Sequence, residues 1–270
     1  MKKFKTLLSS ILYMLLFLCI NFSSIIVFSL IFRLITNLDI NSQDYVTFLA
    51  QFLSKNKIYI VLLSTLILVP IILKIYKKNK ININLSLKKE CINYSIMGFS
   101  ISLILNILLY DFGLQRNISF KIEPLMGILA TAVIGPILEE LVFRGIIYNN
   151  LKKSFSIKNA LLILSLMFAV YHFNLVQGLY AFLFSIIITY YYEKTDNFLV
   201  PMFIHIVGNL AISLVYPYLL QLDFIYIQLV LILLIVVNII SVILLNKKNN
   251  YLQWILNVLQ LLRWLNDKTH

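Results

Sequence analysis

Long apolar runs, separated by short polar breaks, set the pattern of the chain. Eight of these runs are long enough, or nearly so, to cross a bilayer as a helix, which takes roughly 20 residues. The predicted spans are 7–35, 57–73, 92–112, 123–149, 159–175, 176–193, 198–220 and 224–246. Because the apolar residues follow one another rather than alternate with polar ones, the pattern argues against a β-barrel. We therefore predict an all-α, polytopic helical membrane protein with about eight transmembrane helices.

Two segments depart from this simple pattern. The fifth and sixth runs are separated only by Asn174 and Gln177, so they form either a tight hairpin or a re-entrant pair. The segment 251–265 carries large apolar side chains that mostly share one side at helical spacing: Tyr251, Trp254, Ile255, Val258, Leu259, Leu262 and Trp264. We predict that this segment forms a C-terminal amphipathic helix at the cytoplasmic interface of the membrane.

The composition agrees with a membrane protein and orients it. Of the 270 residues, 61% are hydrophobic and 13% are charged, whereas soluble domains carry about 25% charged residues. The net charge is +12, and most lysines lie before the first span, in the loops 74–91 and 150–158, or after the last span. By the positive-inside rule these segments are cytoplasmic, so both termini lie inside the cell.

The same charge distribution bears on partners and location. Basic residues in cytoplasmic loops set the orientation of a membrane protein and contact anionic lipid. The basic excess is explained in this way, so binding of nucleic acid is not expected. The abundance of Asn, Lys and Ile is typical of AT-rich bacterial genomes. We therefore predict a multi-pass protein of a bacterial cell membrane.

Three ionisable residues interrupt the fourth span, where a charge at a helix centre costs at least ~2.5–3.5 kcal/mol. They are Glu139, Glu140 and Arg144. Glu140 and Arg144 are four residues apart, so they share a helix face and can form an ion pair that offsets the cost of burial. Glu139 points about 100° away from Glu140 and has no opposite charge at this spacing. A carboxylate without a partner in an apolar span suits a general base.

Two other spans carry polar residues that can join this group. His172 lies in the fifth run, whereas His205 and Asn209, four residues apart, share a face of the seventh. The remaining histidine, His270, is the C-terminal residue. At 1.5 Å per residue, Glu139 and these three side chains lie roughly 10–21 Å from the cytoplasmic ends of their spans. We therefore expect them to meet in the inner half of the bilayer, around a cavity that opens to the cytoplasm or laterally to lipid.

Three short motifs in these spans resemble those of a known family. They are Glu-Glu-x-x-x-Arg at 139–144, Phe-x-x-x-His at 168–172 and His-x-x-x-Asn at 205–209. In order and placement they resemble the CPBP (ABI) family of intramembrane endopeptidases, which are related to the type II CAAX prenyl protease. The resemblance covers about 123–215. We accordingly divide the single membrane domain into N-terminal transmembrane helices (1–122), a CPBP-like catalytic core (123–220), and a last transmembrane helix with the amphipathic tail (221–270).

This resemblance implies an intramembrane endopeptidase of the glutamate type, which hydrolyses a peptide bond of a hydrophobic, membrane-associated or prenylated peptide. Glu139, helped by His172, would hold and deprotonate the attacking water. His205 and Asn209 would stabilise the oxyanion by hydrogen bonding, and the ion pair of the fourth span would brace the site. The expected partners are this peptide and the lipid bilayer, whereas the substrate's identity, the oligomeric state and the pathway stay open.

Three alternatives remain at the level of sequence. In a metal-dependent version of the site, Glu139, His172 and His205 would hold Zn²⁺ with an open position. The His-Glu-x-x-His signature of many zinc proteases is absent from the sequence, and a site without a cofactor is favoured. The chain could also be a non-proteolytic membrane regulator or bacteriocin-immunity protein on the same fold. A small-solute transporter is the third alternative, for which Gly135-Pro136 and Pro201 are the candidate helix breaks.

Overall fold

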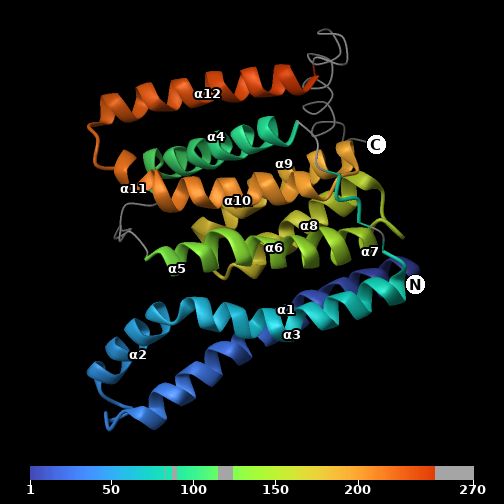
Figure 1. Cartoon of the computed structure of the whole chain (residues 1–270). Helices are drawn as coiled ribbons and strands as arrows, with labels where there is room; N and C mark the ends of the chain where they lie inside the picture. Colours follow the sequence, from blue (N-terminus) through green and yellow to red (C-terminus); the bar gives the residue numbers. More distant parts are fainter. Residues whose placement is uncertain (82, 87–89, 115–123, 247–270) are drawn as a thin grey trace.

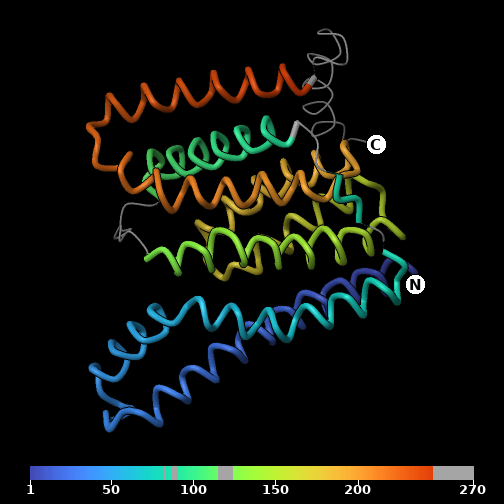
Figure 2. Tube along the Cα trace, in the orientation of Figure 1, coloured from blue at the N-terminus to red at the C-terminus, as the bar shows by residue number. Residues whose placement is uncertain are grey.

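Helices make up most of the chain in the computed structural model, which describes residues 1–81, 83–86, 90–114 and 124–246. In chain order they are α1 (Lys2–Ile35), α2 (Gln43–Lys55), α3 (Lys57–Asn79), α4 (Glu90–Asp111), α5 (Leu125–Ile128), η1 (Leu129–Ile134), α6 (Gly135–Glu140), η2 (Leu141–Tyr148), α7 (Asn149–Leu151), α8 (Ile157–Tyr171), α9 (Leu175–Thr195), α10 (Leu199–Leu214), α11 (Tyr216–Leu219) and α12 (Phe224–Asn246). The elements η1 and η2 are π-helical, and together with α5, α6 and α7 they form one continuous helical run. Figures 1 and 2 show the arrangement.

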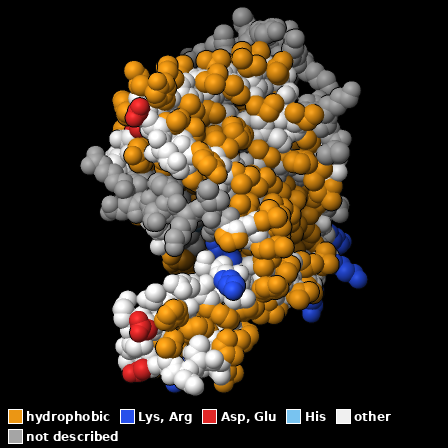
Figure 3. Space-filling view, turned by 60° about the vertical axis from the view of Figure 1, so that its left-hand side comes forward, with side chains coloured by type: hydrophobic (Ala, Val, Ile, Leu, Met, Phe, Trp, Pro, Cys, Tyr) orange, Lys and Arg blue, Asp and Glu red, His pale blue; other side chains and the backbone are white. Residues whose placement is uncertain are grey.

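Six of the described helices are long and apolar enough to cross a membrane: α1, α3, α4, the α5–α7 run, α9 and α12. Two further apolar helices, α8 and α10, are shorter, with 15 and 16 residues. Large apolar side chains such as Leu66, Leu233 and Ile240 are exposed on the outside of the helices, and Figure 3 shows apolar atoms over much of one face. An apolar exterior of this extent is suited to lipid rather than to water. The chain is a polytopic helical membrane protein.

Seven of the eight predicted spans coincide with one helix or with the α5–α7 run, and the span 198–220 covers both α10 and α11. The segment 36–56, which joins the first two predicted spans and which we expect to be a loop, instead contains the helix α2. The side chain of Ser42 caps this helix by accepting a hydrogen bond from the N–H of Tyr45. Asp44 adds a negative charge to the first turn, where the helix dipole favours it. The helix is short and amphipathic, so a search for long apolar runs does not find it.

The fifth and sixth predicted spans form a tight hairpin. The helix α8 ends at Tyr171 and α9 begins at Leu175. Between them Phe173 adopts a positive φ of 51°, and the side chain of Asn174 caps α9 by accepting a hydrogen bond from the N–H of Gln177. The predicted amphipathic tail lies outside the described residues.

The helix α4 packs between α12 and α10, as Figure 1 shows. Two glycines allow α4 and α10 to approach closely. A Cβ atom on Gly98 would overlap the backbone of Ile204, and one on Gly208 would meet the hydroxyl of Ser102. Because Ile204 directly precedes a histidine of the third motif, this contact positions that part of α10.

The helices α1 and α3 pair on the other side of the α5–α7 run, with α2 connecting their far ends (Figures 1 and 2). The buried hydroxyl of Ser64 donates to that of Ser24 at 2.9 Å and joins the two helices. The amide of Asn150 donates to the hydroxyls of Ser9 and Ser10, so α1 is also attached to α7. The α5–α7 run therefore lies at the centre, with helices packed on both sides of it.

Replacing Gly98 by alanine tests the close approach of α4 and α10. The added methyl group would meet the backbone of Ile204, which cannot move without displacing α10, so we expect a loss of stability of about 1–3 kcal/mol. In the control Gly178→Ala, the methyl group would come 3.1 Å from the carbonyl oxygen of Ala169, which is a tight contact without overlap, so a smaller loss is expected. The measurement is unfolding of both variants in the same detergent. Equal stability of the two variants would contradict this account.

Candidate active site

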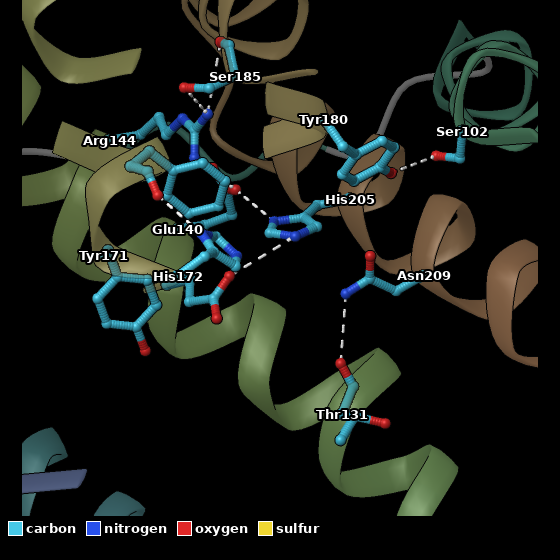
Figure 4. A network of polar contacts seen from close by, with 12 residues as sticks. Ser102, Thr131, Glu140, Arg144, Tyr171, His172, Tyr180, Ser185, His205 and Asn209 are labelled. Carbon is cyan, nitrogen blue, oxygen red and sulfur yellow. Dashed lines mark hydrogen bonds and ion pairs between the residues drawn. The ribbon is translucent and has the colours of Figure 1, made fainter. Parts of the chain in front are cut away.

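The helical run that carries the first motif contains two π-helical segments, which are rare and often occur at functional sites. At the end of the first, the N–H of Gly135 donates to the carbonyl of Ala130, five residues back. Pro136 has no N–H, so it cannot donate to the carbonyl of Thr131, which would be its acceptor in this pattern. The side-chain amide of Asn209 on α10 donates to this carbonyl instead, at 3.3 Å (Figure 4). The proline thus explains why α10 is attached at this point.

The predicted ion pair between Glu140 and Arg144 is present and buried. Nη1 of Arg144 donates to Oε1 of Glu140 at 2.9 Å, and neither side chain is exposed. The guanidinium also donates to the hydroxyl of Thr189 at 3.2 Å and to that of Ser185 at 2.8 Å, both on α9. It lies over the ring of Phe168, 4.9 Å from the ring centroid. The charge of Arg144 is therefore satisfied on several sides inside the bundle.

His205 connects the two neighbouring glutamates. Its Nδ1 lies 2.7 Å from Oε1 of Glu140, and its Nε2 lies 3.7 Å from Oε2 of Glu139 (Figure 4). Because Glu140 is paired with Arg144 and a carboxylate only accepts hydrogen bonds, Nδ1 is the donor. In the neutral form of His205, Nε2 then carries no hydrogen and faces Glu139. The sequence predicts His205 as a site residue but not its bond to Glu140.

His172 is fixed at the end of α8. Its Nδ1 lies 2.7 Å from the carbonyl oxygen of Phe168. A carbonyl only accepts, so Nδ1 carries the hydrogen and Nε2 of a neutral His172 is free to accept one. The ring of Phe168 packs edge-on against both histidines, with centroids 4.9 Å from His172 and 5.9 Å from His205. This packing gives a structural reason for the phenylalanine of the second motif.

A cavity of about 770 Å³ brings together the four residues predicted to be catalytic. Glu139, His172, His205 and Asn209 all line it, together with aromatic and amide side chains. Glu140 does not line it. The side chain of Glu139 is 17% exposed and that of Glu140 is not exposed at all. Two adjacent glutamates therefore have separate environments, one facing the cavity and one buried in an ion pair.

Sequence reasoning missed several residues that support this site. Ser185 and Thr189 hold Arg144, and their spacing of four residues in an apolar helix is a signal that could have found them. Tyr171 and Tyr180 line the cavity, and the hydroxyl of Tyr180 donates to Ser102 at 3.2 Å. No sequence pattern distinguishes these tyrosines from the other aromatic residues of the spans.

The geometry can also be compared with the metal-dependent alternative. Within the described parts of the chain, no three His, Cys, Asp or Glu side chains are grouped as a metal-ligand set. Glu139, His172 and His205 share the cavity, and each histidine uses its Nδ1 for a bond within the protein. Each Nε2 is left for other partners, which is the arrangement that metal-ligating histidines also have, so the metal-dependent site stays an alternative.

Comparisons with known proteins support the resemblance that the motifs indicate. Residues 121–211 match a family model described as "Type II CAAX prenyl endopeptidase Rce1-like", and this segment contains all three motifs. A protein of Bacillus subtilis (strain 168) named "Putative membrane peptidase YdiL" is 30% identical over 138 residues, which are 48% of this chain and 56% of that protein. The match thus spans little more than half of that relative. No solved structure is significantly similar to the chain.

Replacing Arg144 by methionine tests the buried ion pair. Glu140 would be left as an uncompensated buried charge, so we expect a loss of about 3–5 kcal/mol in the free energy of unfolding. The control is Lys152→Met, which removes a partly exposed ion pair with Glu193 and should cost about 0–1 kcal/mol. The measurement is unfolding in detergent, where similar losses for both variants would be inconsistent with the buried pair.

A double-mutant cycle tests the role of Asn209. Asn209→Leu removes the donor to the carbonyl of Thr131, and the loss of this partly buried hydrogen bond costs about 0.5–1.5 kcal/mol. Pro136→Ala restores a backbone N–H that can donate to the same carbonyl. We therefore expect Asn209→Leu to lose less stability in the Pro136→Ala background than alone. Unfolding of all four proteins measures the coupling, and strictly additive losses would argue against this link.

Proposed function

We propose, on the premise of an Rce1-like core at 121–211, that the chain is a membrane endopeptidase that uses a glutamate-activated water. Its substrate would be a hydrophobic or membrane-associated peptide. One observation carries the proposal: of two adjacent glutamates, only Glu139 lines the cavity, and it does so beside two histidines and an asparagine. Glu140 is bonded to Arg144 and His205 and has a supporting position.

In the proposed reaction, Glu139 accepts a proton from a water molecule while the oxygen of that water attacks the scissile carbonyl carbon. The unprotonated Nε2 of His172 accepts the second hydrogen of the same water as a hydrogen bond and orients it. A C–O bond forms and the carbonyl becomes a tetrahedral oxyanion. When the C–N bond breaks, the proton held by Glu139 passes to the leaving amine. The products are a carboxylic acid and an amine, so no other reactant is needed.

The oxyanion needs hydrogen-bond donors that are already in place. Asn209 carries two amide N–H groups, of which one donates to the carbonyl of Thr131. This bond would hold the second N–H group of Asn209 toward the cavity. His205, when protonated at Nε2, would be the other donor, and its bond to Glu140 fixes the ring. In this proposal Glu140 and Arg144 act by positioning His205.

The cavity suits a peptide rather than a small ion. Its volume of about 770 Å³ lies within the range of sites for organic ligands. Apolar side chains such as Phe168, Phe184 and Ile212 form part of its walls. Such walls limit the access of bulk water, which strengthens the electrostatic contacts of Glu139 with the reacting atoms. An apolar peptide or a lipid-modified one would fit these walls.

Replacing Glu139 by glutamine tests the proposal directly. The variant keeps the shape of the side chain but cannot accept the proton, so we expect cleavage to fall by about 10²–10⁴-fold with the unfolding temperature unchanged. The matched control Glu140→Gln changes the neighbouring, buried carboxylate and should lower stability. The assay follows quenched fluorescent peptides, with and without a prenyl group, in nanodiscs, and identifies products by mass spectrometry.

Three outcomes, one of them from a flux measurement in liposomes, decide against parts of the proposal. Equal cleavage by the wild type and Glu139→Gln would overturn the role of Glu139, and solute flux without any cleavage would favour transport. Loss of wild-type activity in a chelator, restored by added zinc, would favour the metal version with Glu139, His172 and His205 as ligands. Activity that persists in the chelator is the expected result.

A further inference from the structure

The cavity extends toward only one end of the helix bundle. At its deep end it is lined by Leu138, Glu139 and His205. Many of its other lining residues lie at the end of α4, in the turn between α8 and α9, or near the end of α10. Examples are Leu114, Asn174, Gln177 and Ser213. Of these, Leu114, Asn174 and Gln177 are exposed, so they mark the mouth.

The opposite end of the bundle is closed below the site. Beyond Glu140 the α5–α7 run continues through Phe143, Tyr148 and Leu151, none of which is exposed. Leu164 of α8 is equally buried in the same hydrophobic cluster, and Ile188 of α9 is buried in another one. The buried guanidinium of Arg144 lies in this packed region. A peptide therefore has no path to Glu139 from that end in this structure.

The distribution of charged residues indicates which end of the bundle faces the cytoplasm. At the closed end, the described residues include the acidic Glu90, Glu193 and Asp196, but basic residues predominate: Lys2, Lys3, Lys5, Lys74, Lys77, Lys78, Lys80, Lys152, Lys153, Lys158 and Lys194. The open end carries Asp39, Asp44, Asp111 and Asp223, with Arg33, Lys55 and Lys57 as its described basic residues. By the positive-inside rule, the closed end is the cytoplasmic one. Figure 3 is turned so that the open end comes forward, and acidic atoms are visible there.

We infer that the active-site cavity is reached from the non-cytoplasmic side of the membrane. The substrate class that follows is a membrane-anchored peptide whose scissile bond lies on that side, close to the end of its apolar segment. That the entering peptide is a substrate rests on the proposed function. The side of access rests on the cavity and the charges alone. The depths of the motif residues predict an opening to the cytoplasm or laterally to lipid, and this inference differs from the first of these.

The mouth has a chemistry that suits such a peptide. The amide N–H groups of Asn174 and the amide group of Gln177 line it, and they can bond to the backbone of an extended peptide whatever its side chains. The turn between α8 and α9 also exposes Phe173 and Leu175, at 69% and 90%. An apolar rim next to the lipid would let an anchored segment stay in the bilayer while its polar end enters the cavity.

Cysteine labelling tests the side of access without requiring any enzyme activity. In a background with Cys19→Ser and Cys91→Ala, single cysteines replace Gln177 at the mouth and Lys153 at the closed end. A charged, membrane-impermeant maleimide is applied to intact spheroplasts and to inverted membrane vesicles. We expect Gln177→Cys to be labelled in spheroplasts but not in sealed inverted vesicles. Lys153→Cys should show the opposite pattern.

Labelling of Gln177→Cys only in inverted vesicles, or from neither side, would overturn the inference. A second arm adds a water-soluble quenched peptide to sealed vesicles of both orientations, with Glu139→Gln as the blank. Cleavage confined to right-side-out vesicles is expected, and cleavage confined to inverted ones would contradict it. If no peptide is cleaved while the labelling pattern holds, the proposed function fails and the side of access stands.

Discussion

The buried carboxylate of Glu140 is the constraint on which the rest of the site depends. A charge in an apolar span is costly, and its burial is tolerable only with a partner and further hydrogen bonds. Arg144 supplies the partner, and His205 donates to the same carboxylate oxygen. Ser185 and Thr189 accept hydrogen bonds from other N–H groups of the Arg144 guanidinium. Through these bonds one carboxylate ties the α5–α7 run to α9 and α10. The side chains around the cavity are arranged by this connection.

The proposed division of labour follows from the position of the two glutamates on the helix. Successive residues point about 100° apart, so two adjacent carboxylates can have different surroundings. Glu140 faces the packed interior, whereas Glu139 is partly exposed toward the cavity. His205 lies between them and can transmit the position of one to the other. A pair of identical residues thus gives one group suited to chemistry and one suited to support.

The sequence predicts the helical membrane fold well, because long apolar runs leave few alternatives. It also predicts the ion pair of Glu140 with Arg144, since a spacing of four residues fixes which side chains share a face. It fails for α2, which is too short and amphipathic to be found as an apolar run. It also misses the bond between His205 and Glu140, because the register between α10 and α6 depends on tertiary packing. The π-helical segments beside Pro136 are equally invisible to a rule that assumes regular helices.

The central claim is that Glu139, rather than Glu140, meets the reacting atoms. The most direct test is a high-resolution map of the protein with a bound hydrophobic peptide that carries a hydroxyl group in place of the scissile carbonyl. This account predicts that the hydroxyl lies within hydrogen-bond reach of Glu139, about 2.6–3.2 Å, while Glu140 stays bonded to Arg144 and His205. A hydroxyl bound to Glu140, or a peptide bound away from this cavity, would contradict it.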